Sequence, residues 1–155
     1  MSRLLPLLFA LSTLLPAVAL ADPVEPEKAF PLSARALNDD TVELRFDIRR
    51  GYYLYRDRLG FAALTEGVTL GPAEMPPGQT YKDAFFGDTE IHRGRLAVLL
   101  PVSAPAGTRV VEIEVKSQGC WDGGVCYPPE KRAVRVDLDA RAADGGLLGR
   151  ALRGG

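Results

Sequence analysis

Residues that hold metal ions are scarce in this chain, and so is an excess of charge of one sign. The 155 residues include two cysteines, Cys120 and Cys126, and one histidine, His92. A zinc site would need two ligands beyond the cysteine pair, which one histidine cannot supply, so we expect no metal site. The formal net charge of -1 provides no broad basic field, which argues against nucleic acid and anionic membranes as partners.

Long apolar runs are also absent after residue 21, where no segment approaches the ~20 apolar residues of a membrane-spanning helix. The first 21 residues have the pattern of a secretory signal peptide, with Arg3 before an apolar stretch at residues 4–18 and a cleavage motif at residues 19–21. We expect cleavage before Asp22 and a soluble mature protein. An uncleaved anchor helix is the alternative, but the apolar stretch is short for a span and contains two prolines.

Glycine and proline are abundant, at 16 and 12 residues, and favour a turn-rich β fold over a helical one. Hydrophobic residues make up 46% and charged residues 25%, which is typical of a globular domain and argues against disorder. The length suffices for one domain with its own core. We place this domain at residues 22–139 and expect residues 140–155 to form a flexible C-terminal tail.

Alternating apolar and polar residues predict several half-buried strands. The clearest segments are residues 41–49, 95–100, 109–116 and 133–139, and shorter ones are residues 33–37, 51–56, 68–70 and 91–93. We expect Pro101 to end the strand before it, and His92 to face solvent on a strand rather than to act as a catalyst or ligand. About seven short strands with frequent turns predict an antiparallel β-sandwich.

Two groups of aromatic residues have less obvious roles. Tyr52, Tyr53 and Tyr55 suit a strand, or a strand edge where rings pack and hydroxyls stay wet, and either plain packing or lining a site is open. Phe85 and Phe86 are adjacent, and adjacent strand residues face opposite ways, so at least one ring should lie outside the core. Such a loop either covers or binds something, or is anchored by one buried phenylalanine.

The two cysteines stand six positions apart, with Asp122, Gly123 and Gly124 between them and strand-like segments on both sides. Asp and Gly tolerate positive φ, so we expect a β-hairpin that places the cysteines opposite or nearly opposite each other. Paired residues have Cα atoms about 4.5 or 5.5 Å apart, which a disulfide accepts. In an exported, oxidised protein we expect the two cysteines to pair.

Such a bond is either a structural staple or a reagent. It closes a short loop and therefore removes little entropy from the unfolded chain, which makes it a weak staple. Its expected place at a hairpin tip also differs from that of the usual sandwich disulfide, which joins the two sheets across the core. These features favour redox function, and a structural bond or another role remains the alternative.

The residues around the cysteines suit a transient protein partner. The glycines at positions 119, 123 and 124 would leave the sulfur atoms open to approach, and Trp121, Val125 and Tyr127 would form an apolar rim. No residue nearby would activate a thiolate, and Asp122 would raise a thiol pKa. We therefore expect thiols that react mainly inside a docked complex.

Three stretches, taken in order, resemble one known family. They are Gly-Tyr-Tyr-Leu-Tyr-Arg at residues 51–56, Asp-Ala-Phe-Phe-Gly at residues 83–87 with Glu90, Ile91 and Arg93 after it, and Gln-Gly-Cys-x5-Cys-Tyr-Pro-Pro-Glu at residues 118–130. They resemble the tyrosine strand, cap loop and active-site hairpin of the N-terminal periplasmic domain of the thiol:disulfide interchange protein DsbD. The resemblance covers roughly residues 28–139.

The resemblance implies an immunoglobulin-like fold and a periplasmic relay of electrons. The family domain is reduced by a thioredoxin-like domain that a transmembrane domain recharges, and it reduces disulfide isomerases and cytochrome c maturation thioredoxins. We expect a monomer that needs no cofactor besides a redox-active disulfide. The implied site consists of Cys126, which forms the mixed disulfide, Cys120, which resolves it, the cap-loop residues Asp83, Phe85, Phe86 and Gly87, of which Phe85 shields the cysteines, and the lining residues Tyr53 and Tyr55.

The chain departs from the family pattern in two ways. Ala84 stands where the best-known members carry an acidic residue, which puts in doubt a second cap-loop carboxylate that tunes the thiol pKa. No transmembrane or thioredoxin-like segment follows residue 139. The chain is then a stand-alone homologue or a fragment, and the signal peptide with the Gly-rich tail favours the first.

Overall fold

The computed structural model describes residues 23–140. The predicted signal peptide, its cleavage before Asp22 and all but the first residue of the predicted tail lie outside this range. No helix within it is long and apolar enough to cross a membrane. The described chain contains the short helix α1 (Pro26–Ala29), the 3-10 turn η1 (Arg56–Arg58) and twelve strands: β1 (Leu32–Asn38), β2 (Thr41–Asp47), β3 (Tyr52–Tyr55), β4 (Gly60–Ala63), β5 (Thr69–Leu70), β6 (Gln79–Asp83), β7 (Gly87–His92), β8 (Arg95–Ser103), β9 (Val110–Ser117), β10 (Gly119–Trp121), β11 (Val125–Cys126) and β12 (Glu130–Asp137).

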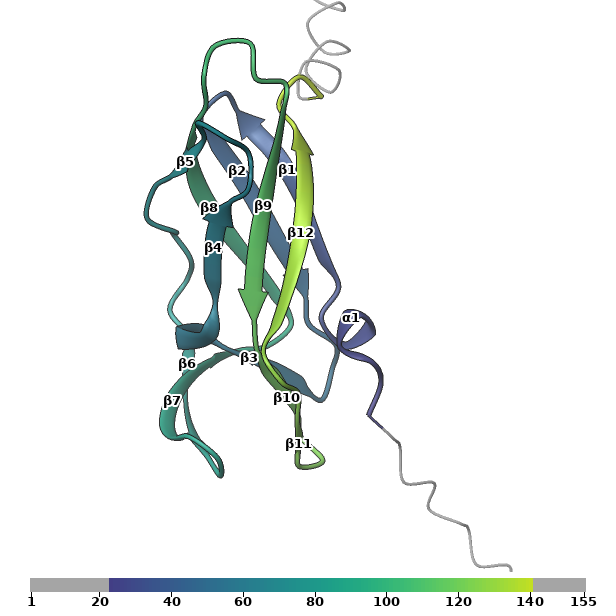
Figure 1. Ribbon diagram of the computed structural model, residues 1–155. Helices are drawn as coiled ribbons and strands as arrows, with labels where there is room; N and C mark the ends of the chain where they lie inside the picture. Colours follow the sequence, from purple (N-terminus) through teal and green to yellow (C-terminus); the bar gives the residue numbers. More distant parts are fainter. Residues whose placement is uncertain (1–22, 141–155) are drawn as a thin grey trace, which may run out of the picture.

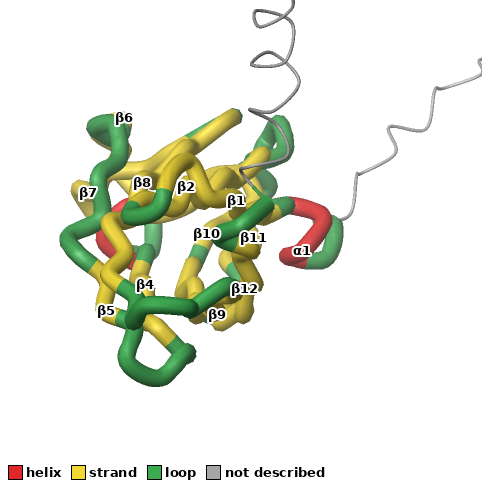
Figure 2. The backbone as a smooth tube through the Cα atoms, turned by 90° about the horizontal axis from the view of Figure 1, so that it is seen from above, coloured by secondary structure: helices red, strands yellow, loops and turns green. Residues whose placement is uncertain are grey.

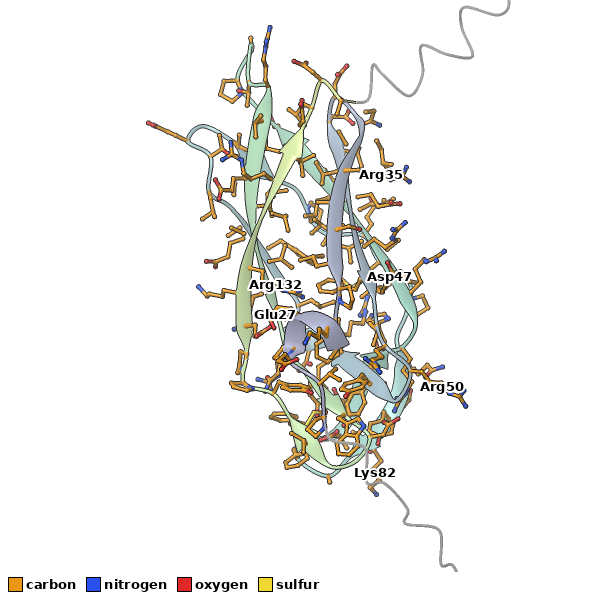
Figure 3. The ribbon with its side chains drawn as sticks, turned by 90° about the vertical axis from the view of Figure 1, so that its right-hand side faces the viewer. Glu27, Arg35, Asp47, Arg50, Lys82 and Arg132 are labelled. Atoms are coloured by element: carbon orange, nitrogen blue, oxygen red, sulfur yellow. A yellow bond between two sulfur atoms is a disulfide. The ribbon has the colours of Figure 1, made fainter. Side chains whose placement is uncertain are left out.

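Two sheets form the body of the molecule, one in the order β1-β2-β8-β5 and the other in the order β12-β9-β4 (Figure 1). All their pairings are antiparallel. The alternating residues of each strand meet in one core, where Leu44, Phe46, Val98, Ile113 and Val115 are buried. Seen from the side, side chains of both layers fill the space between the sheets (Figure 3). The predicted immunoglobulin-like β-sandwich is confirmed.

A third sheet, in the order β11-β10-β3-β7-β6, closes one end of the sandwich (Figure 1). Its strands continue directly from those of the body, since one residue separates β9 from β10 and two separate β7 from β8. One face of β3 carries Tyr52 and Leu54 into the main core, and the other carries Tyr53 and Tyr55 into a second cluster with Ile91. The sandwich thereby holds the end sheet as an extension of its own strands.

The predicted end of one strand is wrong, and two strands were not predicted. Residues 95–100 form a strand as expected, but β8 continues through Pro101 to Ser103. Pro101 pairs with Thr41, where β2 begins, and its carbonyl accepts the Gly71 amide at 2.8 Å. A proline costs the ladder one donor at most, and at the end of its partner strand that loss is small. The strands β4 and β6 lie in segments for which the sequence predicted no strand.

The prediction that His92 faces solvent is wrong, because its side chain is only 6% exposed. His92 pairs with Leu54 of β3, so its side chain lies on the face that the sandwich covers. Burial and the positive charge of Arg56 lower the pKa of His92. The negative charge of Glu90 acts in the opposite direction and is the smaller effect. Of the alternatives for the tyrosines, the strand edge with wet hydroxyls does not hold, because all four residues of β3 are buried.

Candidate functional site

Cys120 and Cys126 lie opposite each other on β10 and β11 and form a disulfide, as predicted. Their Cα atoms are 4.0 Å apart, nearest to the ~4.5 Å of a pair without mutual backbone hydrogen bonds. The three residues of the turn end in Gly124, whose φ of 91° suits glycine. The strands and the turn alone therefore bring the two sulfur atoms together.

The two sulfur atoms differ in their exposure. Cys120 is only 1% exposed because β10 lies between β11 and the tyrosine strand β3. Cys126 is half-buried on the edge strand β11, next to Val125, which is 39% exposed. Of the two cysteines, Cys126 is therefore the more accessible residue, and Cys120 is buried.

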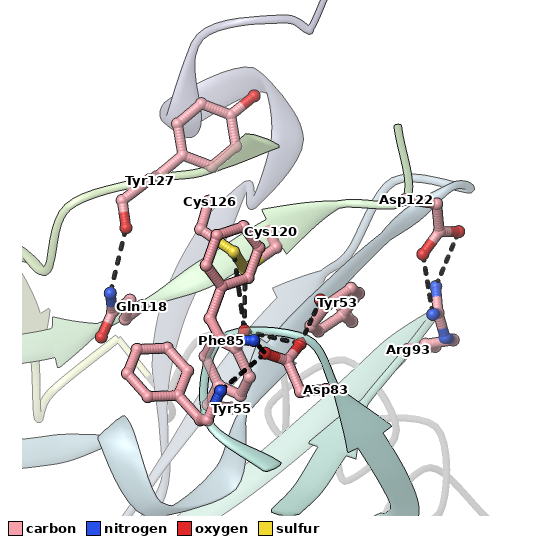
Figure 4. Close-up of a disulfide and its surroundings, with 11 residues drawn as sticks. Tyr53, Tyr55, Asp83, Phe85, Arg93, Gln118, Cys120, Asp122, Cys126 and Tyr127 are labelled. Atoms are coloured by element: carbon pink, nitrogen blue, oxygen red, sulfur yellow. Dashed lines mark hydrogen bonds and ion pairs between the residues drawn. A yellow bond between two sulfur atoms is a disulfide. The ribbon is translucent and has the colours of Figure 1, made fainter. Parts of the chain in front are cut away.

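Asp83 connects the tyrosine strand to the disulfide (Figure 4). Its Oδ2 accepts the hydroxyls of Tyr53 at 2.6 Å and Tyr55 at 2.9 Å. The Tyr55 hydroxyl is also 2.9 Å from the Cys120 Sγ and 3.6 Å from the Cys126 Sγ. A buried carboxylate thus lies one hydroxyl away from both sulfur atoms.

These contacts set the charge of the site. Burial alone would raise the pKa of Asp83, but the two tyrosine hydroxyls and the amides of Phe85 and Phe86 hold this pKa below its usual value. Burial raises the pKa of Tyr53 above its usual value and that of Tyr55 to about 12, and the hydrogen bonds of both to Asp83 favour their neutral forms. At neutral pH the network therefore holds one negative charge, on Asp83.

The cap loop is the turn between β6 and β7, and Asp83 begins it. The Asp83 Oδ1 accepts the amides of Phe85 at 2.7 Å and Phe86 at 3.0 Å, which fixes the turn from inside. Gly87 closes it with a φ of 71°. Phe85 and Phe86 are 59% and 42% exposed, so both rings lie outside the core, as expected for at least one of them.

The two phenylalanines of the cap loop differ in their contacts. The Phe86 ring packs edge-on against Tyr55, with centroids 5.0 Å apart, and Arg58 lies 4.6 Å over its face. Phe85 is the more exposed ring, and in the view of Figure 4 it extends across the disulfide. The cap loop thus carries one ring with partners on the protein and one more exposed ring that overlaps the disulfide in this view.

Asp122 does not act on the sulfur atoms as expected, because its carboxylate turns away from them (Figure 4). It forms two hydrogen bonds to Arg93, at 3.0 and 2.8 Å. The Arg93 guanidinium also lies 4.8 Å over the ring of Tyr53 and 5.7 Å over that of Tyr81. The carboxylate that faces the cysteines is Asp83.

Gly119 and Gly123 of the hairpin permit close packing of neighbouring groups rather than access to the sulfur atoms. A Cβ at Gly119 would lie 2.3 Å from the carbonyl oxygen of Tyr53 and 2.6 Å from the ring of Phe30, so this position is closed. A Cβ at Gly123 would meet the ring of Trp121 at 2.2 Å. Gly119 is buried, so it does not open a path to the sulfur atoms.

The expected apolar rim lies on one face of the hairpin, opposite the sulfur atoms, since Val125 pairs with Trp121. Trp121 pairs with Tyr52, and the Tyr127 amide bonds to the Gly119 carbonyl, which places both side chains on the face opposite the sulfur atoms. Both are half-buried and pack against the main core. On this hairpin the exposed apolar residue is Val125.

The comparison with known families agrees with this geometry. Residues 21–138 match the family model described as "Thiol:disulfide interchange protein DsbD, N-terminal". The chain belongs to this family. The DsbD of Ralstonia nicotianae is 45% identical over 133 residues, covering 84% of this chain and 22% of that protein. DsbD 2 of Pseudomonas aeruginosa is 39% identical over 119 residues, covering 77% of this chain and 19% of that protein.

Solved structures of the same family share this fold. The N-terminal domain of Neisseria meningitidis DsbD in the reduced form matches with a TM-score of 0.62 and 31% identity, over 74% of this chain and 89% of that one. The same family domain in a complex with the PilB N-terminal domain matches with a TM-score of 0.61 and 31% identity, over 74% and 88% of the two chains. The chain spans about a fifth of the length of its curated DsbD relatives.

Sequence reasoning missed residues that complete the family site. Arg93 matched the family pattern but received no role, and Tyr81 and Arg58 received none either. Tyr81 packs on Tyr53 with centroids 5.1 Å apart. A signal for Tyr81 was available, since it precedes Asp83 by two positions and shares its face if the segment is a strand. Among residues 23–140 no three side chains of the metal-ligating types gather as a metal site would require.

Proposed function

We propose that this domain carries out thiol:disulfide interchange with protein partners through the Cys120–Cys126 pair. The observation that supports this most is the contact of the Tyr55 hydroxyl with both sulfur atoms and with buried Asp83, at the place in the family fold where the cysteine hairpin lies. A structural bond needs no such network. On this proposal the domain is an enzyme, a thiol:disulfide oxidoreductase that works as a protein-disulfide reductase.

Reduction of the domain begins at Cys126. The thiolate of an electron donor attacks the Cys126 Sγ, forms a mixed disulfide with it and breaks its bond to Cys120. Cys120 leaves as a thiolate, 2.9 Å from the Tyr55 hydroxyl, whose single proton can then turn from Asp83 to this sulfur. A second donor thiol then attacks the donor sulfur, which leaves both cysteines of the domain reduced and the donor oxidised.

Delivery of the electrons runs the same steps in reverse. The Cys126 thiolate attacks a partner's disulfide and forms a mixed disulfide, and one partner sulfur leaves as a thiol. The Cys120 thiolate then attacks Cys126 Sγ, re-forms the internal bond and releases the second partner sulfur. The short Cα separation of 4.0 Å supports rapid closure, because little backbone movement is needed.

The negative charge of Asp83 restrains the reduced domain. A carboxylate beside a thiol disfavours the thiolate and raises the thiol pKa. The charge therefore disfavours the thiolate of free Cys126, which slows its reaction with small oxidants. A docked partner supplies the activation that the domain lacks.

The partner surface is the exposed apolar area around Cys126. Phe85 and Phe86 are exposed on the cap loop, and exposed apolar side chains mark a contact site for proteins. Partners of the family type are thioredoxin-like proteins, among them periplasmic disulfide isomerases and cytochrome c maturation thioredoxins, with a membrane protein as electron donor. The site of action is the periplasm, where the Neisseria domain's complex with the PilB N-terminal domain provides an example of such docking.

A trapping experiment tests this function and the roles of the two cysteines. In Cys120→Ser the resolving thiol is missing, so a mixed disulfide between Cys126 and an oxidised thioredoxin-like protein should accumulate. Cys126→Ser is the matched control and should trap little, because Cys120 is buried. Non-reducing electrophoresis measures the adduct. Trapping by Cys120 alone would reverse the roles, and no trapping by either variant would reject the function.

A further inference from the structure

The segment from Val24 to Phe30, called the N-terminal strap below, crosses the back of the cysteine hairpin. Figure 2 shows its helix α1 beside β10 and β11. The strap is tied to the turn after β2, where the Arg49 amide donates to the Ala29 carbonyl at 2.9 Å. Ala29 and Phe30 are 0% and 2% exposed, so the strap is part of the packed structure.

Two tyrosines hold the start of the strap by their hydroxyls. The Val24 amide donates to the Tyr52 hydroxyl at 3.0 Å, and the Tyr127 hydroxyl donates to the Val24 carbonyl. Both backbone polar groups of one residue are thus bound by side chains of the end sheet. Burial, with Tyr52 beside it, raises the pKa of Tyr127 to about 12, so this hydroxyl keeps its proton.

The ring of Phe30 fixes the strap against the hairpin. It packs edge-on against Tyr52 and Tyr127, with centroids 6.0 and 5.8 Å apart, and those two rings stack at 6.5 Å. It occupies the space that the missing side chain of Gly119 leaves, since a Cβ there would be 2.6 Å from the ring. Gly119 therefore permits the strap to dock beside Cys120.

Tyr127 directly follows Cys126, and this gives the strap its effect on the site. The edge strand β11 has two residues and pairs with β10 alone. Beyond that pairing and the disulfide, the segment is held at Tyr127, whose amide donates to the Gly119 carbonyl at 3.0 Å and whose carbonyl accepts the Gln118 side chain at 3.2 Å. When the disulfide opens, the pairing of β11 with β10 and the anchor at Tyr127 remain to keep Cys126 in register.

We propose that the N-terminal strap, acting through Tyr127, is a positioning device that holds the Cys126 sulfur close to Cys120 while the disulfide is open. This inference rests on the proposed exchange function and adds a group to it. In the closing step the Cys120 thiolate attacks Cys126 Sγ, the Cys126–partner bond breaks, and the partner leaves as a thiol. The strap raises the rate constant and the equilibrium constant of this step, because it keeps the two sulfur atoms near each other.

The test compares two single hydroxyl deletions in the whole chain. Tyr127→Phe removes the hydrogen bond between the residue that follows Cys126 and the Val24 carbonyl. Tyr52→Phe removes the hydrogen bond of the Val24 amide, whose partner lies on β3, a strand that carries no cysteine. Each variant and the parent chain are equilibrated with reduced and oxidised dithiothreitol, and the dithiol fraction is measured by alkylation and mass spectrometry. A separate sample with glutathione measures the lifetime of the mixed disulfide.

Tyr127→Phe should shift the equilibrium toward the dithiol by about two- to fivefold, the effect of part of one hydrogen bond, and should lengthen the life of the glutathione adduct. Tyr52→Phe, which loosens the strap without touching the neighbour of Cys126, should shift the equilibrium less, and the distant core variant Ile113→Val should leave it at the parent value, even though both lower stability. An unchanged equilibrium in Tyr127→Phe, or an equal shift in Tyr52→Phe, overturns the proposal.

Two further results keep the test decisive. If Tyr127→Phe does not fold, Phe30→Leu is the second variant, because it loosens the strap without removing a hydrogen bond. It is expected to shift the equilibrium in the same direction. No shift in Phe30→Leu would overturn the proposal. A parent disulfide that only the strongest dithiothreitol ratios reduce would reject the exchange function itself, and the comparison among variants would still decide the strap.

Discussion

Asp83 joins the cap loop to the sulfur atoms through a single side chain. One of its carboxylate oxygens holds the loop amides, and the other holds Tyr53 and Tyr55. The same residue therefore shapes the lid and supplies the charge beside the cysteines. Ala84, the next residue, is exposed and uncharged, so the charge that contacts the tyrosines is that of Asp83.

Replacing Asp83 with Asn should make the reduced thiols more reactive. Asn keeps an oxygen for the loop amides and removes the negative charge that opposes a thiolate. We expect alkylation of reduced Cys126 by iodoacetamide at neutral pH to be about three- to tenfold faster, as a fall of up to about one unit in thiol pKa would give. Asp122→Asn is the control, since that carboxylate pairs with Arg93. Equal rates in Asp83→Asn and the parent would contradict the role of the charge.

His92 should make the stability of the domain depend on pH near neutrality. The folded state lowers the pKa of His92, so the unfolded chain, with a value of ~6.5, takes up the proton first. Stability is therefore full above about pH 6.5 and falls as the pH drops toward the lowered value, by at most ~1.4 kcal/mol per pH unit. Urea unfolding at about pH 7.5 and about pH 5.5 measures this fall. His92→Gln should flatten it, and an equal fall in the variant would place the effect on other groups.

At the scale of elements, the site is made of two hairpins side by side in one sheet. The β10–β11 hairpin presents the cysteines and the β6–β7 hairpin presents the cap loop, with β3 and its tyrosines between them. Each turn uses a glycine with positive φ, Gly124 or Gly87. A lid on one hairpin can then move without disturbing the pairing of the other.

Removing the ring of Phe85 should open the disulfide side of the cap loop. Phe85 is 59% exposed, so its loss should leave the fold intact. We expect reduced Phe85→Ala to be alkylated several-fold faster than the parent, with little change in thermal stability. Phe86→Ala is the comparison, since that ring packs on Tyr55 and Arg58. A rate that does not change in Phe85→Ala would show that this ring is no lid.

The long strands could be predicted from the sequence because one face of each is buried. Residues 41–49 alternate strictly, and Val42, Leu44 and Phe46 are 0% exposed. The end sheet was harder to predict, because β3 is buried on both faces and shows no alternation. For that reason the sequence left the burial of the tyrosines open, and the solvent position predicted for His92 was wrong.

At the scale of the whole molecule, the sandwich brings three distant stretches of the chain together. The tyrosines of β3, the cap loop and the cysteine hairpin lie about 30 and 35 positions apart in sequence, and they meet because β3 pairs with both β10 and β7. These three stretches could be identified from the sequence, because their motifs resemble those of a known family. The contact of Tyr55 with the sulfur atoms, the pairing of Asp122 with Arg93 and the strap over Gly119 follow only from the packing.

The reduction potential of the Cys120–Cys126 pair tests the central claim most directly. The bond can be equilibrated with dithiothreitol buffers of known potential, and the dithiol fraction read by alkylation and mass spectrometry. An exchange protein should have a potential between about -180 and -270 mV, where disulfide isomerases and thioredoxins lie. A potential below about -300 mV, which structural disulfides have, would contradict the proposed function.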